Sequence, residues 1–94
     1  MRTIAMVGAS PNWNRPSFFA MKYLMAKGYS VVPVNPGLAG QEILGQPVFA
    51  SLEQVPGPVQ MVDIFRNSDA ALDVTRDAIR LKDRLGIEVI WMQL

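Results

Sequence analysis

Short apolar runs alternate along the chain with longer stretches in which apolar residues recur every three or four positions. Thr3–Val7 (TIAMV) and Ser30–Val34 (SVVPV) carry no charged residue, and residues 59–65 and 87–92 carry one acidic residue each. Apolar runs of this length are typical of strands that are buried on both faces of a parallel sheet. The pattern therefore predicts four main strands.

The first stretch with helical periodicity covers residues 16–27. Pro16 suits the first turn of a helix, where its missing N–H is not needed, and Gly28 suits a left-handed position after the last turn. The apolar residues at helical spacing, expected to face the core, are Phe18, Met21, Leu24 and Met25.

A second helix is predicted over residues 68–85. Ser68 is the expected N-cap, Asp69 suits the positive end of the helix dipole, and Gly86 ends the helix. Its apolar stripe consists of Ala71, Val74, Ala78, Leu81 and Leu85.

Strands that alternate with helices predict an α/β fold, a doubly wound, Rossmann-like parallel sheet with right-handed crossovers. Residues 38–58 are rich in glycine and proline and are expected to be irregular, with a short strand near Val48 and a helical turn from Ser51. Pro33 cannot donate to a strand ladder, so the second strand should lie at a sheet edge.

The composition says little more about the fold, but it excludes several kinds of functional site. The 94 residues predict one domain, residues 1–94, and the net charge of +1 gives no basic excess for nucleic acid. The chain has no cysteine and no histidine, which excludes disulfides, thiolate or imidazole metal sites and histidine-dependent triads. No segment reads as a signal peptide or a transmembrane helix, so we expect a cytoplasmic protein without membrane contact.

Ligands of open parallel sheets bind at the carboxyl ends of the strands, and the loop after the first strand has the chemistry for an anion there. Gly8 permits a close backbone approach, Ser10 offers a hydroxyl, and Arg15 stands before a helix whose first N–H groups are free. The alternative is a tight turn with a solvated arginine. Only one glycine of the dinucleotide fingerprint is present, and Asn35 replaces the acidic residue that holds the NAD ribose.

Other candidates at these strand ends have two readings each. Residues 35–37 could line an adenine or form an ordinary turn, and Arg66 could meet a phosphate or lie in solvent. Asp63 could be catalytic, but a hydrogen-bonded structural carboxylate is the preferred reading. Trp13 could stack on a base or pack on protein, and Trp91 is expected in the core.

Several motifs together resemble a known family. The segments VGAS…RPS, GYSVVPVNPGLAGQEILGQPVFASLEQVP, VDIFRNS and VIWMQL are similar to the small stand-alone CoA-binding proteins, relatives of the CoA-binding domain of the succinyl-CoA synthetase alpha subunit. The resemblance covers essentially the whole chain. It implies a Rossmann-like domain that holds coenzyme A.

The resemblance also implies residue roles. Gly8, Ala9 and Ser10 would cradle the pyrophosphate, with Arg15 and Ser17 at the helix start. Residues 34–36 would contact the adenosine side, residues 65 and 66 the pyrophosphate or pantetheine, and residues 92 and 93 the pantetheine path. These last three groups are Val34, Asn35, Pro36, Phe65, Arg66, Met92 and Gln93.

The chain departs from the family pattern in two places. Gly37 and Leu38 stand where members commonly carry a lysine, so Lys22 or Arg15 is the expected partner of the 3′-phosphate. The family domain continues past WMQ, so we expect its C-terminal part to be absent after the fourth main strand. This would expose a sheet edge through which a homodimer could form.

The sequence therefore favours non-catalytic binding of CoA or an acyl-CoA, with no catalytic residue and no metal site. Two alternatives remain open at this point. One is a minimal Rossmann-like domain that has retained no ligand. The other, less favoured, is a component of a nucleotide-dependent oxidoreductase or ligase, because the chain lacks both histidine and the dinucleotide fingerprint.

Overall fold

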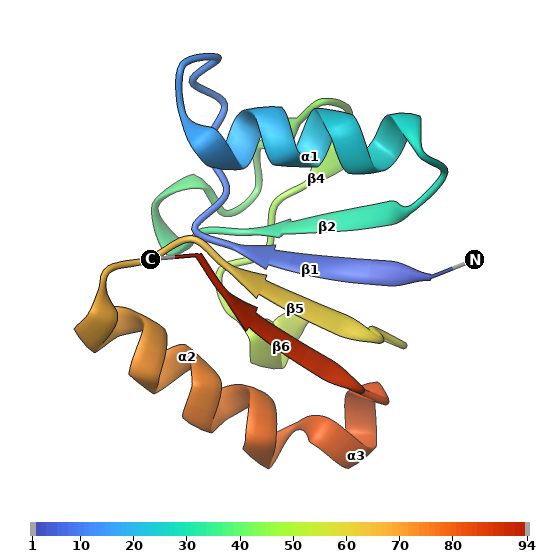
Figure 1. The fold of residues 1–94 in the computed structure, drawn as a ribbon, viewed down its shortest axis with the longest axis vertical. Coiled ribbons are helices and arrows are strands. Elements are labelled where there is room, and N and C mark those ends of the chain that lie inside the picture. The colour runs from blue at the N-terminus through green and yellow to red at the C-terminus, as the bar shows by residue number, and fades with distance from the viewer. Residues whose placement is uncertain (1, 94) are drawn as a thin grey trace.

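A four-stranded parallel sheet lies between two helical layers (Figure 1). The computed structural model describes residues 2–93. The sheet order is β2-β1-β5-β6, which confirms the predicted α/β, Rossmann-like class. The main elements are β1 (Thr3–Val7), α1 (Pro16–Ala26), β2 (Ser30–Val34), β5 (Met61–Ile64), α2 (Ser68–Arg80), α3 (Lys82–Leu85) and β6 (Val89–Met92).

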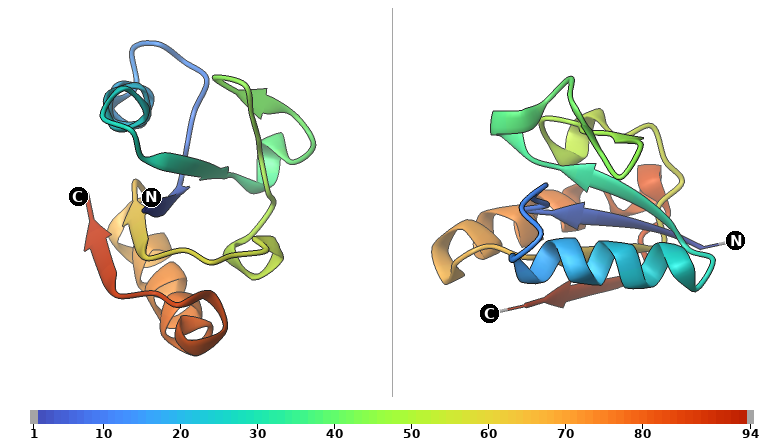
Figure 2. Two further views of the ribbon diagram at one scale, coloured as in Figure 1. Left: turned by 90° about the vertical axis from the view of Figure 1, so that its right-hand side faces the viewer. Right: turned by 90° about the horizontal axis from the view of Figure 1, so that it is seen from above.

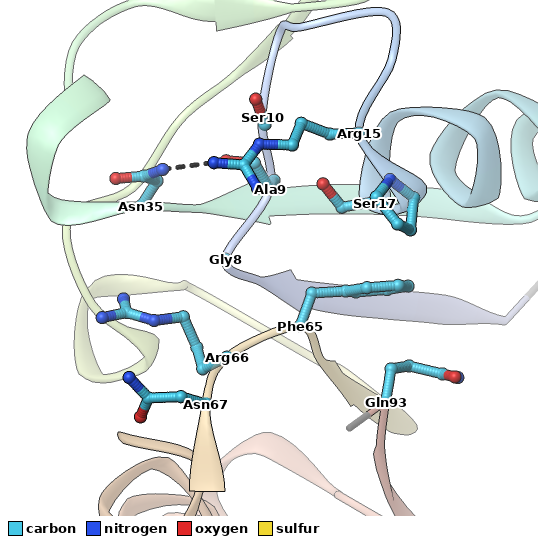
Figure 3. A pocket seen from close by; sticks show the side chains of 11 residues that line it. Gly8, Ala9, Ser10, Arg15, Ser17, Asn35, Phe65, Arg66, Asn67 and Gln93 are labelled. Atoms are coloured by element: carbon cyan, nitrogen blue, oxygen red, sulfur yellow. Dashed lines mark hydrogen bonds between the residues drawn. The ribbon is translucent and has the colours of Figure 1, made fainter. Parts of the chain in front are cut away.

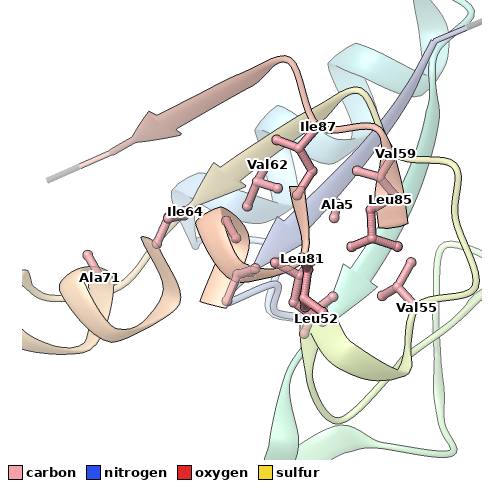
Figure 4. Close-up of a cluster of buried hydrophobic side chains, with 13 residues drawn as sticks. Ala5, Leu52, Val55, Val59, Val62, Ile64, Ala71, Leu81, Leu85 and Ile87 are labelled. Carbon is pink, nitrogen blue, oxygen red and sulfur yellow. The ribbon is translucent and has the colours of Figure 1, made fainter. Parts of the chain in front are cut away.

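The two faces of the sheet are covered by different helices (Figure 2). On one face Met6 and Val31 pack with Met21 of α1. On the other face a larger cluster forms beneath α2 and α3 (Figure 4). That cluster includes Ala5, Val62, Ile64, Ala71, Ala78, Leu81 and Leu85. The apolar stripes predicted for both helices therefore face the core.

The chain leaves β1 toward β2 on one side and later returns to place β5 on the other side of β1. The strand order thus reverses between β1 and β5. In open α/β sheets the crevice at such a switch point, outside the carboxyl ends of the strands, is where ligands bind.

The second helix differs from its prediction at both ends. Its N-cap is Asn67, whose side chain accepts a hydrogen bond from the Ala70 N–H, and not Ser68. The helical stretch is also interrupted at Leu81, where the backbone turns at φ −96° and ψ 3° and separates α2 from α3. Gly86 ends α3 in the left-handed conformation, at φ 77°, as expected.

The segment predicted to be irregular contains a small hairpin of β3 (Glu42–Ile43) and β4 (Gln46–Pro47). Leu44 and Gly45 connect the strands with positive φ angles of 49° and 80°. Two consecutive positive φ angles are the mark of the two-residue turn that suits a twisted hairpin. Two 3₁₀ turns, η1 (Pro36–Leu38) and η2 (Leu52–Gln54), flank the hairpin, the second being the helical turn expected after Ser51.

The two outer strands of the sheet have different surroundings. β2 is an edge strand, as Pro33 predicted, and the Pro33 carbonyl accepts from Phe49 outside the ladder with β1. At the other edge, the expectation that Trp91 lies in the core is wrong, because its side chain is 56% exposed. Within residues 2–93, β6 has a neighbouring strand on one side only.

The described helices are all too short or too polar to cross a membrane.

Candidate functional site

A cavity of about 570 Å³ opens at the carboxyl ends of the strands, at the switch point between β1 and β5 (Figure 3). Its walls come from the loop after β1, the start of α1, the end of β2, the loop after β5 and the residue that follows β6. The lining residues are Gly8, Ala9, Ser10, Arg15, Pro16, Ser17, Asn35, Phe65, Arg66, Asn67 and Gln93.

Gly8 is where the two central loops touch. Its φ is +88°, and a Cβ atom there would overlap the Phe65 carbonyl oxygen and lie 2.9 Å from Arg66 Cδ. The Gly8 N–H donates to Val34 O at 2.9 Å, and the Phe65 N–H donates to Val7 O at 2.8 Å. Only glycine meets both the backbone conformation and the space, so the cavity floor depends on this residue.

The charged side chains that line the cavity are both arginines. Arg15 precedes α1 and Arg66 follows β5, and Figure 3 shows them reaching in from opposite walls. Neither forms an ion pair with a carboxylate among residues 2–93. Guanidinium groups that line a cavity without a carboxylate partner are suited to bind a phosphate or another oxyanion.

The start of α1 adds to this preference for an anion. Arg15 is the N-cap and makes no side-chain capping bond, and Pro16 needs no partner at the first position. Ser17, which lines the cavity, is buried with only 3% of its surface exposed. The first-turn N–H groups of a helix lack intrahelical partners and carry positive partial charge, so they attract anions.

Asn35 shapes the wall of the cavity by holding two loops. Its Nδ2 donates to Ala9 O at 2.8 Å, and its Oδ1 accepts from the Gly37 N–H at 2.9 Å. The side chain thus ties the loop after β1 to the end of β2. Ser10 similarly turns its own loop, because its hydroxyl oxygen accepts from the Asn12 N–H at 3.1 Å.

Asp63 lies on the α1 side of the sheet and is only 4% exposed. Its Oδ1 accepts a hydrogen bond from Nε2 of Gln93 at 3.2 Å. Burial raises the pKa of the Asp63 carboxyl above its usual value, and the Gln93 hydrogen bond opposes this shift. The hydrogen-bonded carboxylate preferred from the sequence is therefore present.

The twelve residues proposed from the sequence fall into two groups in the structure. Nine line the cavity: Gly8, Ala9, Ser10, Arg15, Ser17, Asn35, Phe65, Arg66 and Gln93. Three do not: Val34 is buried in the core, Pro36 lies in η1, and the Met92 sulfur accepts from Thr75 Oγ1 of α2 at 3.7 Å. Strand alternation explains Met92, because neighbouring residues of β6 point to opposite faces.

Two of the lining residues, Pro16 and Asn67, are not among the site residues proposed from the sequence. The sequence predicts Pro16 as a helix start only, and it favours Ser68 over Asn67 as the helix cap. The order Arg66-Asn67 after an apolar strand was a signal, since asparagine is a strong N-cap. Lys22, considered for the 3′-phosphate, lies outside the cavity lining.

Metal-binding side chains do not gather anywhere in residues 2–93. No group of three or more histidine, cysteine, aspartate or glutamate residues is close enough there to hold an ion.

Comparison with known proteins identifies relatives of the whole chain. A family model described as a CoA binding domain matches residues 2–94. The uncharacterized protein YneT of Bacillus subtilis (strain 168) is 37% identical over 92 residues, which are 98% of this chain and 64% of that protein.

Solved structures of proteins with 30–36% sequence identity to this chain have the same fold. A hypothetical protein from Pyrococcus horikoshii OT3 superposes with a TM-score of 0.82 at 36% identity, covering 94% of this chain and 58% of that one. A protein from Thermus thermophilus gives a TM-score of 0.81 at 30% identity, covering 96% and 81%. This chain therefore spans less than two thirds of the Bacillus and Pyrococcus proteins.

Proposed function

The chain belongs to the CoA-binding domain family, and we propose that it binds coenzyme A or an acyl-CoA without carrying out a reaction on it. The observation that carries the proposal is the cavity at the β1/β5 switch point, with a helix start near Gly8 and two arginines that form no ion pair within residues 2–93. A pocket of a few hundred Å³ or more is the usual size for a cofactor site.

The residues present fit the chemistry of this cofactor. A pyrophosphate needs close backbone approach and positive charge, and both are found at Gly8, Arg15, Ser17 and Arg66. The Asn35 side chain is used in holding loops, so we assign it a supporting role at the adenosine side. When bound, CoA would supply its own thiol or thioester, and the chain's part is to bind and orient it.

The side chains available in this chain favour a binding role without catalysis. The chain contains no histidine or cysteine, so no imidazole base and no thiol nucleophile can act on the ligand. Asp63 is buried and bonded to Gln93. A ligase of the synthetase type would need a phosphorylatable histidine, as the family resemblance implies.

Isothermal titration with CoA, 3′-dephospho-CoA, ADP and NADH tests the proposal. We expect CoA to bind and Arg15→Ala to weaken it by at least about tenfold, because a hydrogen bond to a charged group is worth about 1.5–3 kcal/mol. Lys82→Ala is the matched control, since it removes the same charge from the exposed surface of α3, outside the cavity lining, and should change little.

Other results of this titration would contradict the proposal in distinct ways. No binding of any ligand at millimolar concentration would mean that the domain has retained no ligand. Binding of NADH alone would favour an oxidoreductase component. Equal losses in the Arg15 and Lys82 variants would show that charge alone, and no contact in the cavity, governs the affinity.

We further propose that two copies of the chain associate through the edge of β6 that has no strand beside it within residues 2–93. Val89 and Gln93 donate their N–H groups to β5, so strand alternation turns the main-chain groups of Ile90 and Met92 outward. The strand carries no charge that would oppose pairing.

A further inference from the structure

The cavity has two ends of different chemistry. Arg15 and Arg66 stand on the loops after β1 and β5, and Gln93 follows the outer strand β6. The guanidinium groups are donors with full positive charge, whereas an amide offers one acceptor and one donor group. What the second end can bind depends on which way the Gln93 amide faces.

The position of Gln93 is fixed by the sheet. Its N–H donates to Ile64 O at 2.8 Å, which extends the β5–β6 ladder by one residue beyond Met92. Residues two apart in a strand share a face, so Gln93, Trp91, Phe65 and Asp63 all lie on the α1 side of the sheet. Figure 3 shows the Gln93 side chain running along the same wall as Phe65.

The orientation of the Gln93 amide is fixed by Asp63. The Gln93 Nε2 donates to Asp63 Oδ1 at 3.2 Å, and the carboxylate form of Asp63 can only accept a hydrogen bond, which favours this orientation of the amide. The neighbours of Asp63 across the sheet are Met6 and Trp91, which offer it no charged partner. Burying a carboxylate among apolar neighbours costs free energy. A buried carboxylate of this kind beside a cavity is therefore a candidate for a functional role.

We propose that Asp63 is a positioning residue that holds Gln93 with its Oε1 as the acceptor at the β6 end of the cavity. This end then takes a neutral hydrogen-bond donor of the ligand, an amide N–H or a hydroxyl. Phosphate oxygens are excluded from it, because they would face a carbonyl oxygen with a carboxylate behind it. This agrees with the family resemblance, which implies that the ligand's phosphates lie near Arg15 and Arg66 and its amide-bearing arm near Gln93.

This inference rests on the proposed function. Comparing the binding of two ligands distinguishes a failure of the inference from a failure of the proposed function. CoA carries an arm with amide groups, whereas 3′,5′-ADP has the adenosine, the 3′-phosphate and one 5′-phosphate but no arm. Asp63→Asn can donate to Oε1 and so releases the amide from its single orientation. We expect this variant to bind CoA about fivefold more weakly, equivalent to one hydrogen bond of about 1 kcal/mol, and to bind 3′,5′-ADP unchanged.

A double-mutant cycle shows whether Asp63 acts through Gln93. Gln93→Met keeps the length of the side chain and removes the amide, so it should lose the same affinity for CoA. Asp63→Asn should then have no further effect in the Gln93→Met background. Asp83→Asn is the matched control, because it makes the same charge change on the exposed surface of α3.

A measurement on the ligand-free protein keeps the inference testable if no ligand binds. Hydrogen exchange of the Gln93 side-chain amide, followed by NMR, should be slower than that of the exposed Gln54 amide, and Asp63→Asn should remove the difference. Equal exchange of the two amides in the wild type would overturn the inference. So would an equal loss of CoA and 3′,5′-ADP binding in Asp63→Asn, or an undiminished loss in the Gln93→Met background.

Discussion

The main chain at Gly8 passes so close to the loop after β5 that no side chain fits between them. Residue 8 has a positive φ, and Phe65 and Arg66 occupy the space that a Cβ would need. Gly40 also has a positive φ, of 87°, but no atom lies within 4 Å of the position of its Cβ. The two glycines therefore separate the cost of backbone conformation from the cost of contact.

Gly8→Ala should destabilise the protein more than Gly40→Ala. Each pays about 1–2 kcal/mol for a left-handed alanine, and only the first must also push the loop after β5 away. Urea denaturation measures the difference in the free energy of unfolding. Equal losses in the two variants would contradict the contact at Gly8. Titration should show a loss of CoA affinity in Gly8→Ala and none in Gly40→Ala, because Arg66 moves with the displaced loop.

Single residues differ in how far the sequence could place them. Gly8 and Arg66 could be found because each directly follows an apolar run, and parallel strands bring such ends to one edge of the sheet. Arg15 could be found because it stands directly before the predicted helix start at Pro16. Trp91 could not be placed, because its exposure depends on what covers the outer strand. Burial of an apolar residue in an edge strand is decided by neighbours distant in the sequence.

At the scale of elements, α2 begins in the wall of the cavity. Asn67 lines the cavity and also caps the helix, accepting from the Ala70 N–H at 2.9 Å. Asn67→Ala should lower the free energy of unfolding by about 1 kcal/mol, the usual loss for an N-cap. Ser68→Ala, one position along, should cost less because Ser68 is not the cap. Thermal or urea denaturation of both variants checks the assignment, and a larger loss in Ser68→Ala would reverse it.

Two features of the elements could not be predicted from the sequence, each for its own physical reason. The β3–β4 hairpin turns at Leu44, and a leucine with positive φ has no propensity signal in the sequence. The separation of α2 from α3 at Leu81 leaves the apolar stripe unbroken, so periodicity could not reveal it. The long elements were found because their burial patterns repeat over several turns or residues.

At the scale of the whole molecule, the sheet has two unlike edges. The outer edge of β2 is hydrogen-bonded to another part of the chain. The Phe49 N–H donates to Pro33 O, and the Asn35 N–H donates to Phe49 O. Beyond β6, within residues 2–93, no strand follows, and Val89 and Trp91 are 51% and 56% exposed. An uncharged edge with apolar neighbours is a template for pairing with another chain.

If β6 pairs with β6 of a second copy, the outward N–H of Met92 is one of the bonds across the dimer. Met92→Pro removes this donor and spares the bonds to β5, because proline lacks an N–H only at its own position. Light scattering coupled to gel filtration should give twice 10.4 kDa for the wild type and for the control Met92→Val, and 10.4 kDa for Met92→Pro. A wild type that stays at 10.4 kDa at every concentration would refute the dimer. A dimeric proline variant would place the contact on another surface, and Trp91→Lys would then test the exposed face of the same strand.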